Sequence, residues 1–254
     1  MADTLLTEKG APSKGTRPEG ATTEADASRK VREMFTRIAP RYDLLNHLLS
    51  FNVDRLWWRK TARGFASILK RQDVRVLDLC CGTGDMTFAL FREAEESAKI
   101  LGVDFSHAML QRANEKSAER SPRWVEADAL QLPFPDQQFD LITAAFGFRN
   151  LADYDAGLRE MLRMLRLGGE CGILDFGEPR GLIGKLYRVY FKHILPAVGT
   201  VVSGVKGPYV YLPASVERFP SPEEMLGRMR RAGFREASWT PYTFGIAGLY
   251  RGKK

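Results

Sequence analysis

The segment Val74–Met86, with the sequence VRVLDLCCGTGDM, constrains the fold of this chain more than any other segment. Its first six residues are mostly apolar and predict a strand buried on both faces, as in a parallel sheet. The turn that follows contains Gly82 and Gly84, which can adopt positive φ angles and let a ligand approach the backbone closely. A strand that passes through a glycine turn into a helix is typical of nucleotide-type pockets. The segment therefore predicts an α/β fold with a ligand site where this strand ends.

The rest of the chain continues this alternation of strand and helix. It ends in two short segments that predict an antiparallel hairpin. This order predicts a Rossmann-like doubly wound sheet, preceded by helices over residues 28–72. After these, helices are expected over 84–95, 106–120, 153–166 and 221–234, and strands over 74–79, 98–104, 123–128, 139–146, 169–176, 235–240 and 244–252.

Polar residues at the ends of successive strands indicate which nucleotide the pocket holds. Asp104 ends the second strand, about 20 residues after the turn, where a carboxylate can accept hydrogen bonds from both hydroxyls of a ribose. Asp128 ends the third strand, where it can meet an adenine amino group while the Ala129 amide lies near a ring nitrogen. Thr87 replaces the third glycine of a dinucleotide fingerprint, and Asp85 would repel a phosphate, so an amino group is favoured over a diphosphate. Together these features predict S-adenosylmethionine as the ligand and methyl transfer as the reaction.

Composition limits the cellular setting and the partners. The formal net charge of +7 favours nucleic acid or an anionic lipid surface as a partner, and a solvated basic surface accounts for it equally well. The three cysteines and three histidines show no metal-ligand spacing, so no metal and a reducing, cytoplasmic location are expected. No signal pattern occurs, and no apolar run reaches the ~20 residues of a membrane helix. Residues 1–27 are expected to be a disordered tail before a single domain over 28–254.

Longer stretches of the chain resemble a known family. The sequences YDLLNHLLSFNVDRLWW (42–58), FGFRN (146–150) and RMLRLGGECGILDFG (163–177) are similar to signature regions of the ubiquinone/menaquinone biosynthesis C-methyltransferase family. The similarity extends over nearly the whole chain after the tail, including the C-terminal TFGIAGLYRGKK. Asp54 stands where many members have histidine, and Asp175 and Gly177 replace glutamate and serine. The first signature is matched at Tyr42, Asp43, Asn46, Ser50 and Trp57.

The resemblance implies a class I fold and S-adenosylmethionine-dependent C-methylation of a polyprenylated quinol. The sequence CCGTGD and Asp54 favour demethylmenaquinol as the acceptor over the ubiquinone precursor 2-polyprenyl-6-methoxy-1,4-benzoquinol. Arg149 is then expected to hold the acceptor oxygen or a proton-accepting water, with Asn150 beside it and Tyr42 closing the pocket. His193 is a further candidate for the proton step. Carried over by position, the family's cofactor contacts fall on Thr83, Asp104, Asp128 and Ala129, next to Gly82 and Gly84 of the turn.

The apolar, aromatic and basic segment 181–219 is expected to be an insertion that covers a greasy substrate. A membrane-resident acceptor would bring the protein to the inner face of an anionic membrane as a peripheral protein, without nucleic acid as a partner and with its oligomeric state open. Expected to line the trough are Leu186, Tyr187, Tyr190, Phe191, Ile194 and Leu195, and Lys185, Arg188 and Lys192 are expected to face lipid headgroups.

Three other functions remain open on the sequence. The same fold could methylate RNA or a soluble metabolite, and YRVYFKH offers aromatic residues beside basic ones for stacking on bases. A nicotinamide-dependent oxidoreductase is disfavoured by Thr87 and Asp85. A catalytically silent subunit of a quinone-synthesis assembly is disfavoured by the intact pocket residues.

Overall fold

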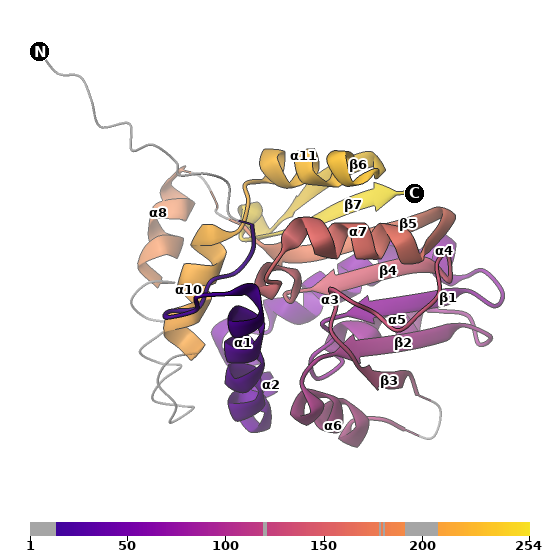
Figure 1. Cartoon of the computed structure of the whole chain (residues 1–254), viewed down its shortest axis with the longest axis horizontal. Coiled ribbons are helices and arrows are strands. Elements are labelled where there is room, and N and C mark those ends of the chain that lie inside the picture. Colours follow the sequence, from indigo (N-terminus) through magenta and orange to yellow (C-terminus); the bar gives the residue numbers. More distant parts are fainter. Residues whose placement is uncertain (1–13, 119–120, 178, 180, 191–207) are drawn as a thin grey trace, which may run out of the picture.

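A mixed sheet organises the part of the chain that the computed structural model describes, residues 14–118, 121–177, 179, 181–190 and 208–254. Its strand order is β3-β2-β1-β4-β5-β7-β6, and β7 runs antiparallel to both of its neighbours (Figure 1). The order reverses between β1 and β4, where doubly wound sheets bind ligands. The predicted α/β sheet with a C-terminal hairpin is thus confirmed. The strands are β1 (Arg75–Leu79), β2 (Lys99–Asp104), β3 (Arg123–Glu126), β4 (Phe139–Ala145), β5 (Leu165–Phe176), β6 (Arg235–Tyr242) and β7 (Ala247–Lys253).

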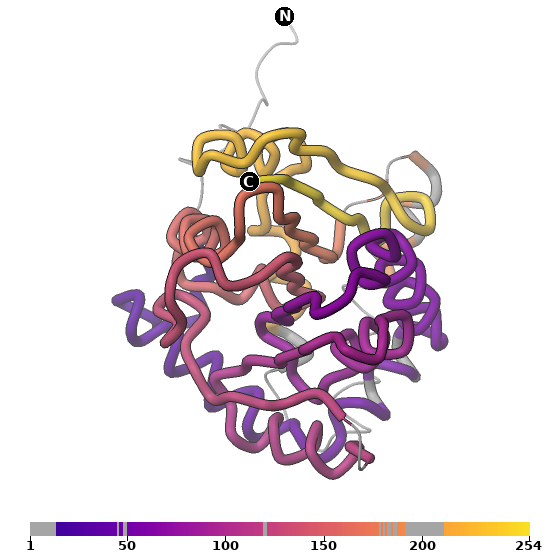
Figure 2. The backbone as a smooth tube through the Cα atoms, turned by 90° about the vertical axis from the view of Figure 1, so that its right-hand side faces the viewer, coloured from indigo at the N-terminus to yellow at the C-terminus, as the bar shows by residue number. Residues whose placement is uncertain are grey.

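The strands send alternate residues into two cores, one on each face of the sheet. On β1, Val76 belongs to one core and Leu77 to the other, and Leu141 and Ile142 on β4 divide in the same way. This division follows from the two-residue period of a strand and explains why the central strands are apolar throughout. Figure 2 shows helices on both sides of the sheet. The first core includes α3 (Val53–Gly64), α4 (Ala66–Leu69) and α5 (Asp85–Glu93), and the second includes α7 (Tyr154–Met164) and α11 (Pro222–Ala232).

Further helices gather where the parallel strands end, at the left of Figure 1. The hydroxyl of Thr23 accepts a hydrogen bond from the Asp26 amide at 3.1 Å and so caps the first of them. That helix ends at Ile38, just before Pro40, which cannot continue the hydrogen bonding of a helix. These helices close the edge of the sheet at which the polar residues were predicted to meet. They are α1 (Glu24–Ile38), α2 (Tyr42–Leu49), α8 (Gly181–Val189) and α10 (Pro208–Arg218), with α6 (His107–Glu115) against β2 and β3.

The prediction of a disordered tail over residues 1–27 is wrong for residues 14–27. Residues 14–18, which we call the N-terminal strap, lie against the segment that follows β4. The Thr16 amide donates to the Leu151 carbonyl at 2.8 Å, and the Lys14 carbonyl accepts from the Tyr154 amide at 2.8 Å. Backbone groups make these contacts, so the strap has no apolar periodicity that would predict it. Residues 1–13 lie outside the described residues.

The described parts of the segment 181–219 are helical, which its sequence did not predict. Gly181 and Gly184 lie within α8 and Pro213 lies inside α10, and these residue types weaken a helical pattern in the sequence. Within the helical region predicted over 28–72, Phe65 separates α3 from α4. No helix within the described ranges is both long and apolar enough to cross a membrane. Outside these ranges lie Phe191, Lys192, His193, Ile194 and Leu195, and the structure describes no side chain for Lys185 and Leu186.

Candidate active site

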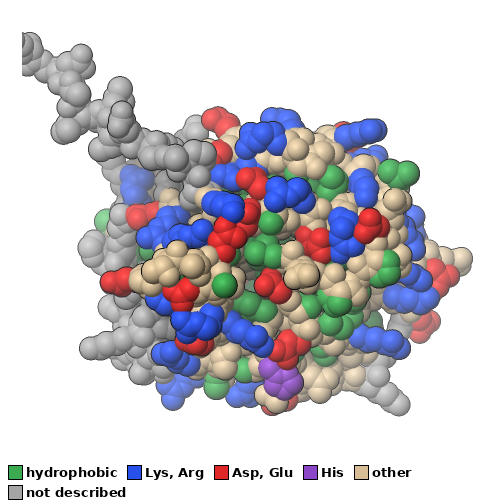
Figure 3. Space-filling view, in the orientation of Figure 1, with side chains coloured by type: hydrophobic (Ala, Val, Ile, Leu, Met, Phe, Trp, Pro, Cys, Tyr) green, Lys and Arg blue, Asp and Glu red, His purple; other side chains and the backbone are tan. Residues whose placement is uncertain are grey.

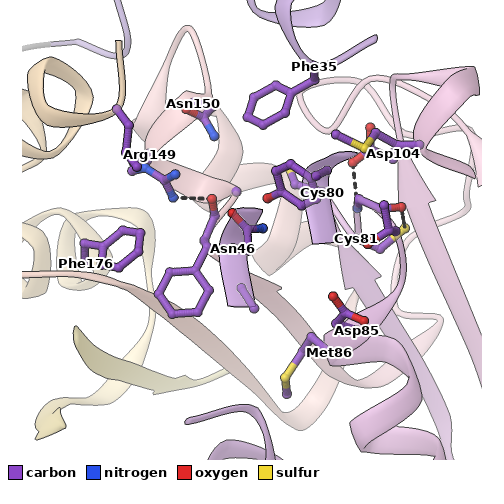
Figure 4. A pocket seen from close by; sticks show the side chains of 18 of the residues that line it. Phe35, Asn46, Cys80, Cys81, Asp85, Met86, Asp104, Arg149, Asn150 and Phe176 are labelled. Atoms are coloured by element: carbon purple, nitrogen blue, oxygen red, sulfur yellow. Dashed lines mark hydrogen bonds between the residues drawn. The ribbon is translucent and has the colours of Figure 1, made fainter. Parts of the chain in front are cut away.

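A cavity of about 350 Å³ lies at the carboxyl ends of the parallel strands, enclosed by α1, α2, α3, α8 and α10 (Figure 4). Its lining divides into two parts. The polar end is formed by Gly82, Thr83, Asp85, Asp104 and Asp128, and the aromatic end by Phe51, Trp57, Phe146, Phe176 and Tyr190.

The glycine turn forms one wall of the polar end. Gly82 has a φ of 55°, and a Cβ atom placed on it would meet only the Tyr42 ring, at 3.9 Å, so the turn is open to the cavity. Gly84 has a φ of 85° and does not line the cavity. A Cβ atom on Gly84 would lie 2.6 Å from the Trp124 ring. The second glycine therefore gives the turn its shape and packs against Trp124, and the ligand contact expected of it stays a prediction.

Asp104 is a buried carboxylate at the end of β2, pointing toward the turn. Its Oδ2 accepts from the Gly82 amide and its Oδ1 from the Ser106 amide, both at 2.9 Å. Each oxygen keeps a lone pair for a ligand, because one carboxylate oxygen can accept two hydrogen bonds. Burial raises the pKa of Asp104 from 3.8 to about 6, and hydrogen bonds from the backbone amides of Ser106, Gly82 and Phe105 oppose that rise. The carboxylate is thus held in one orientation beside the open turn.

Asp128 and Ala129 extend this wall beyond the end of β3. Asp128 is exposed to solvent, and its Oδ1 accepts from the Leu130 amide at 2.9 Å, which fixes the side chain. Ala129 is buried, and both residues line the same cavity as Asp104. The structure therefore brings the three predicted nucleoside contacts together on one wall.

Thr83 is tied to α2 directly, and Asp85 is tied to it through Lys116. The Thr83 hydroxyl donates to the Asp43 carboxylate. The Lys116 ammonium donates to Asp43 and to Asp85, at 2.9 Å in each case. Burial raises the pKa of Asp85, and the nearby Lys116 charge opposes the shift. The cation that Asp85 was expected to attract is therefore supplied here by the protein itself, and these bonds hold α2 over the turn.

Asp78 lies beneath the turn and explains the threonine at the third-glycine position. The Thr87 hydroxyl donates to Asp78 Oδ2 at 2.6 Å, and the Thr143 hydroxyl to Oδ1 at 2.7 Å. Burial raises the pKa of Asp78 from 3.8 to about 6, against the effect of both hydroxyls. Thr87 thus takes part in a buried polar cluster that fixes β1, β4 and the start of α5 together. Threonine in place of the third glycine of a dinucleotide fingerprint is the sequence signal of this cluster.

The aromatic end is built from rings that contact one another. The centroids of Phe146 and Phe176 lie 4.6 Å apart, and those of Trp57 and Phe146 lie 5.8 Å apart. Trp57 Nε1 donates to the Thr243 hydroxyl at 2.8 Å, which fixes that ring, and Phe51 lies 6.2 Å from Tyr190. Rings arranged in this way offer flat apolar surface, suited to a flat aromatic ligand.

Arg149 lies between the two ends of the cavity and is 4% exposed. Its Nη1 pairs with Asp175 Oδ1 at 3.0 Å and also donates to the Phe146 carbonyl. Its guanidinium carbon lies 5.2 Å from the centre of the Phe176 ring. In the part of the chain that the structure describes, the buried Nε of Arg149 has no hydrogen-bond partner. A buried donor without a partner is costly, and an oxygen atom of a ligand can relieve that cost.

Asn150 and Tyr42, the other two expected catalytic residues, also line the cavity. Asn150 Oδ1 accepts from the Tyr211 hydroxyl at 2.9 Å. Tyr42 lies over the glycine turn, and burial raises the pKa of its hydroxyl while a hydrogen bond with Asn46 opposes the rise. All three candidates therefore share one cavity, although Tyr42 lies at the polar end, against Gly82. Arg149 lies nearer to the aromatic end, beside Phe176 (Figure 4).

Several residues of the site carry no local sequence signal. Lys116 belongs to a stretch of polar residues near the end of α6, Tyr211 to the segment 181–219, and Thr16 to the expected tail. Tyr211 lines the cavity, while Lys116 and Thr16 bond the lining residues Asp85 and Tyr211. These are tertiary contacts, which a single sequence does not reveal.

The strand order, the reversed last strand and the acid opposite an open glycine turn together define a class I S-adenosylmethionine-dependent methyltransferase. The model of the ubiE/COQ5 methyltransferase family matches residues 22–254, and the chain belongs to this family.

Curated relatives agree with this assignment over most of their length. The chain is 48% identical to the demethylmenaquinone methyltransferase of Deinococcus radiodurans, over 90% of this chain and 94% of that protein. It is 47% identical to the protein of the same name from Thermus thermophilus, over 87% of this chain and 100% of that protein. It is 44% identical to the ubiquinone/menaquinone biosynthesis C-methyltransferase UbiE of Geobacter sulfurreducens, over 89% of this chain and 88% of that protein.

Solved structures share the fold at much lower identity. The [4+2]-cyclase SpnF covers 94% of this chain and 99% of its own length, with a TM-score of 0.65 at 18% identity. A SAM-dependent methyltransferase from Thermotoga maritima covers 87% of this chain and 98% of its own length, with a TM-score of 0.62 at 19% identity. One of these two neighbours is named a cyclase, so the fold by itself does not specify the reaction.

S-adenosylmethionine is the methyl donor of this family, and the polar end of the cavity fits it. The donor carries a ribose diol, an adenine and a charged amino-acid head. Asp104 offers free acceptor positions beside a turn where the backbone of Gly82 is open. Asp128 and Ala129 lie farther along the same wall. The hydrogen-bond acceptors on this wall are those that such a nucleoside requires.

Proposed function

We propose that this protein transfers a methyl group to a ring carbon of a polyprenylated quinol, and that the acceptor is demethylmenaquinol. The observation that carries the proposal is the aromatic end of the cavity, which lies next to the polar end and adjoins Arg149. The names of the relatives at 48% and 47% identity support the same acceptor. A second acceptor, 2-polyprenyl-6-methoxy-1,4-benzoquinol, is supported by the relative named for both quinone pathways.

In this proposal the polar end holds the methyl donor. Asp104 accepts from the two ribose hydroxyls, Asp128 from the adenine amino group, and the Ala129 amide donates to the adenine ring. Gly82 and Thr83 line the turn against the amino-acid part, while Gly84 gives the turn its shape. Each charge-assisted hydrogen bond contributes about 1.5–3 kcal/mol, so Asp104 dominates the affinity for the donor.

The residues nearer the aromatic end would prepare the acceptor. The bound donor supplies a sulfonium methyl group, whose C–S bond breaks as the quinol ring carbon forms the new C–C bond and then releases its proton. Arg149 donates to an acceptor oxygen and stabilises the negative charge that grows on it, and Asn150 donates beside it. Tyr42 covers the donor and excludes water. Good alignment of two reactants can lower a barrier by roughly 7–11 kcal/mol, so no strong base is needed.

We also propose that the mouth of the cavity docks on an anionic membrane, where a polyprenylated acceptor resides. Four large apolar side chains, which we call the apolar rim, are between 56% and 76% exposed. Phe51 lines the cavity itself. Leu56, Val189 and Phe244 directly adjoin the lining residues Trp57, Tyr190 and Thr243 in sequence. Exposed Arg55, Arg59 and Arg188 stand beside them and suit anionic headgroups. The rim consists of Phe51, Leu56, Val189 and Phe244.

A methyl-transfer assay tests the acceptor directly. We expect radiolabelled methyl from S-adenosylmethionine to enter demethylmenaquinol, and to enter the benzoquinol more slowly. The oxidised quinone of each acceptor is the matched control, because its ring carbon is not electron-rich and should take up no label. Equal labelling of quinol and quinone, or labelling of added RNA instead, would contradict the proposal.

A further inference from the structure

Thr16, Tyr211 and Asn150 form a line of hydrogen bonds that ends at the cavity. The Thr16 hydroxyl lies 2.6 Å from the Tyr211 hydroxyl, which in turn lies 2.9 Å from Asn150 Oδ1. The three residues come from the N-terminal strap, from α10 and from the turn Phe148–Asn150 after β4. The line therefore joins three segments that are far apart in the sequence.

The direction of these hydrogen bonds follows from the number of protons. A tyrosine hydroxyl carries one proton, and that of Tyr211 is donated to Asn150 Oδ1. The Thr16 hydroxyl must then be the donor in its contact with Tyr211. With its carbonyl oxygen committed to Tyr211, the Asn150 amide presents its two N–H groups on the other side. Figure 4 shows this amide nitrogen pointing into the cavity, on the same side as Arg149.

The start of the line is firmly anchored. Thr16 is 1% exposed, and its amide donates to the Leu151 carbonyl at 2.8 Å. The Arg17 guanidinium donates to the Ala152 carbonyl at 3.2 Å, and Arg218 of α10 donates to the Arg17 carbonyl. The strap is thus bound both to the segment after Asn150 and to the helix that carries Tyr211. A fixed second layer of this kind is what holds a side chain of a site in one orientation.

We propose that Tyr211 and Thr16 are positioning residues for the acceptor. They fix the Asn150 amide so that its N–H groups, and not its oxygen, face an oxygen of the acceptor ring. This inference rests on the proposed function, because it takes a quinol oxygen as the hydrogen-bond acceptor. Arg149 and Asn150 then donate from neighbouring positions, and together they determine which ring carbon faces the methyl donor.

Steady-state kinetics on the purified full-length protein, with S-adenosylmethionine and short-tailed demethylmenaquinol, test this role. We expect Tyr211→Phe to raise the KM for the quinol about five- to tenfold, the loss that one hydrogen bond of about 1–1.4 kcal/mol causes. Thr16→Val should raise the same KM by a smaller factor. The Kd for S-adenosylmethionine, measured by calorimetry, should not change in either variant. Tyr242→Phe and Thr22→Val are the matched controls, because Tyr242 is a buried tyrosine that does not line the cavity and Thr22 is an exposed threonine.

A double-mutant cycle distinguishes positioning from general loosening. In an Asn150→Ala background, Tyr211→Phe should have no further effect on the quinol KM, because the amide it positions is absent. A full additional loss in that background, or an unchanged KM in Tyr211→Phe, would overturn the inference while wild-type methylation of the quinol continued. If the wild-type protein did not methylate the quinol at all, the proposed function itself would fail. A variant whose thermal unfolding midpoint falls sharply is replaced in the cycle by Thr16→Val.

Discussion

Asp104 is a buried acid whose proposed role requires it to be ionised. Only the carboxylate can accept from both ribose hydroxyls while it also accepts from the Gly82 and Ser106 amides. Burial raises its pKa to about 6, so below pH 6 the free protein holds it mostly protonated, and one oxygen becomes a donor. Asp78, whose pKa is also about 6, lies close enough for the two charges to interact, so the two groups titrate as a pair.

We therefore expect the affinity for S-adenosylmethionine to rise with pH through this range. If ligand binding keeps Asp104 ionised, the Kd at pH 5 should be about tenfold higher than at pH 7, and the curve should level off above pH 6. Asp104→Asn should weaken binding at pH 7 by about 10- to 100-fold and remove most of the pH dependence. Calorimetry at pH 5, 6 and 7 measures both effects. Asp73→Asn, which alters an acid whose side chain is 76% exposed, is the control. A flat wild-type profile would speak against this role.

Among the elements, the N-terminal strap is held by contacts that leave no room for a side chain at Gly15. A Cβ atom on Gly15 would overlap the backbone carbonyl of Ala152, which cannot move aside as a flexible side chain can. We expect Gly15→Ala to detach the strap and to lower the free energy of unfolding by about 1–3 kcal/mol, the usual cost of overpacking. Trypsin should then cleave after Lys14, the basic residue of the strap that no proline follows, much faster than in the wild type.

The matched control for this variant is Gly64→Ala at the end of α3, where a Cβ atom meets nothing within 4 Å. Mass spectrometry of the digests locates the cleavage, and chemical unfolding gives the stability. Equal cleavage after Lys14 in the wild type and in Gly15→Ala would mean that the strap is not docked in solution.

The strap also shows where the sequence stops being informative. The central strands were predictable because burial on both faces requires continuous apolar runs, and Asp104 and Asp128 because parallel strands end at the same edge of a sheet. The strap, Tyr211 and Lys116 were not, since backbone groups and single polar atoms make their contacts, and neither leaves a periodic pattern. Pro213 inside α10 and the two glycines of α8 weaken the helical pattern of their segments, so the sequence does not predict these helices.

At the scale of the whole molecule, the net charge of +7 does not by itself identify a docking face. Figure 3 shows Lys and Arg side chains spread over one whole face of the molecule, with acidic side chains between them. The apolar rim is more specific, because large apolar side chains and exposed arginines occur together beside the aromatic end of the cavity. A lipid surface satisfies both features: its anionic headgroups attract the arginines, and its acyl region accepts the apolar tips.

Vesicle flotation tests this docking surface. We expect the protein to float with vesicles that contain anionic phosphatidylglycerol more than with pure phosphatidylcholine, and to be released as salt screens the arginines. Leu56→Ser combined with Phe244→Ser should lower the partition coefficient about thirtyfold, since partial insertion of each side chain contributes about 1 kcal/mol. Leu167→Ser is the control, because that leucine is 79% exposed but lies near the start of β5, at the opposite end of the sheet. The double variant and the Leu167→Ser control should both methylate a tailless, water-soluble quinol at the wild-type rate, because none of the three substituted residues lines the cavity. Equal loss of flotation in the Leu167 variant, or no preference for anionic lipid, would show that the rim is not the docking surface.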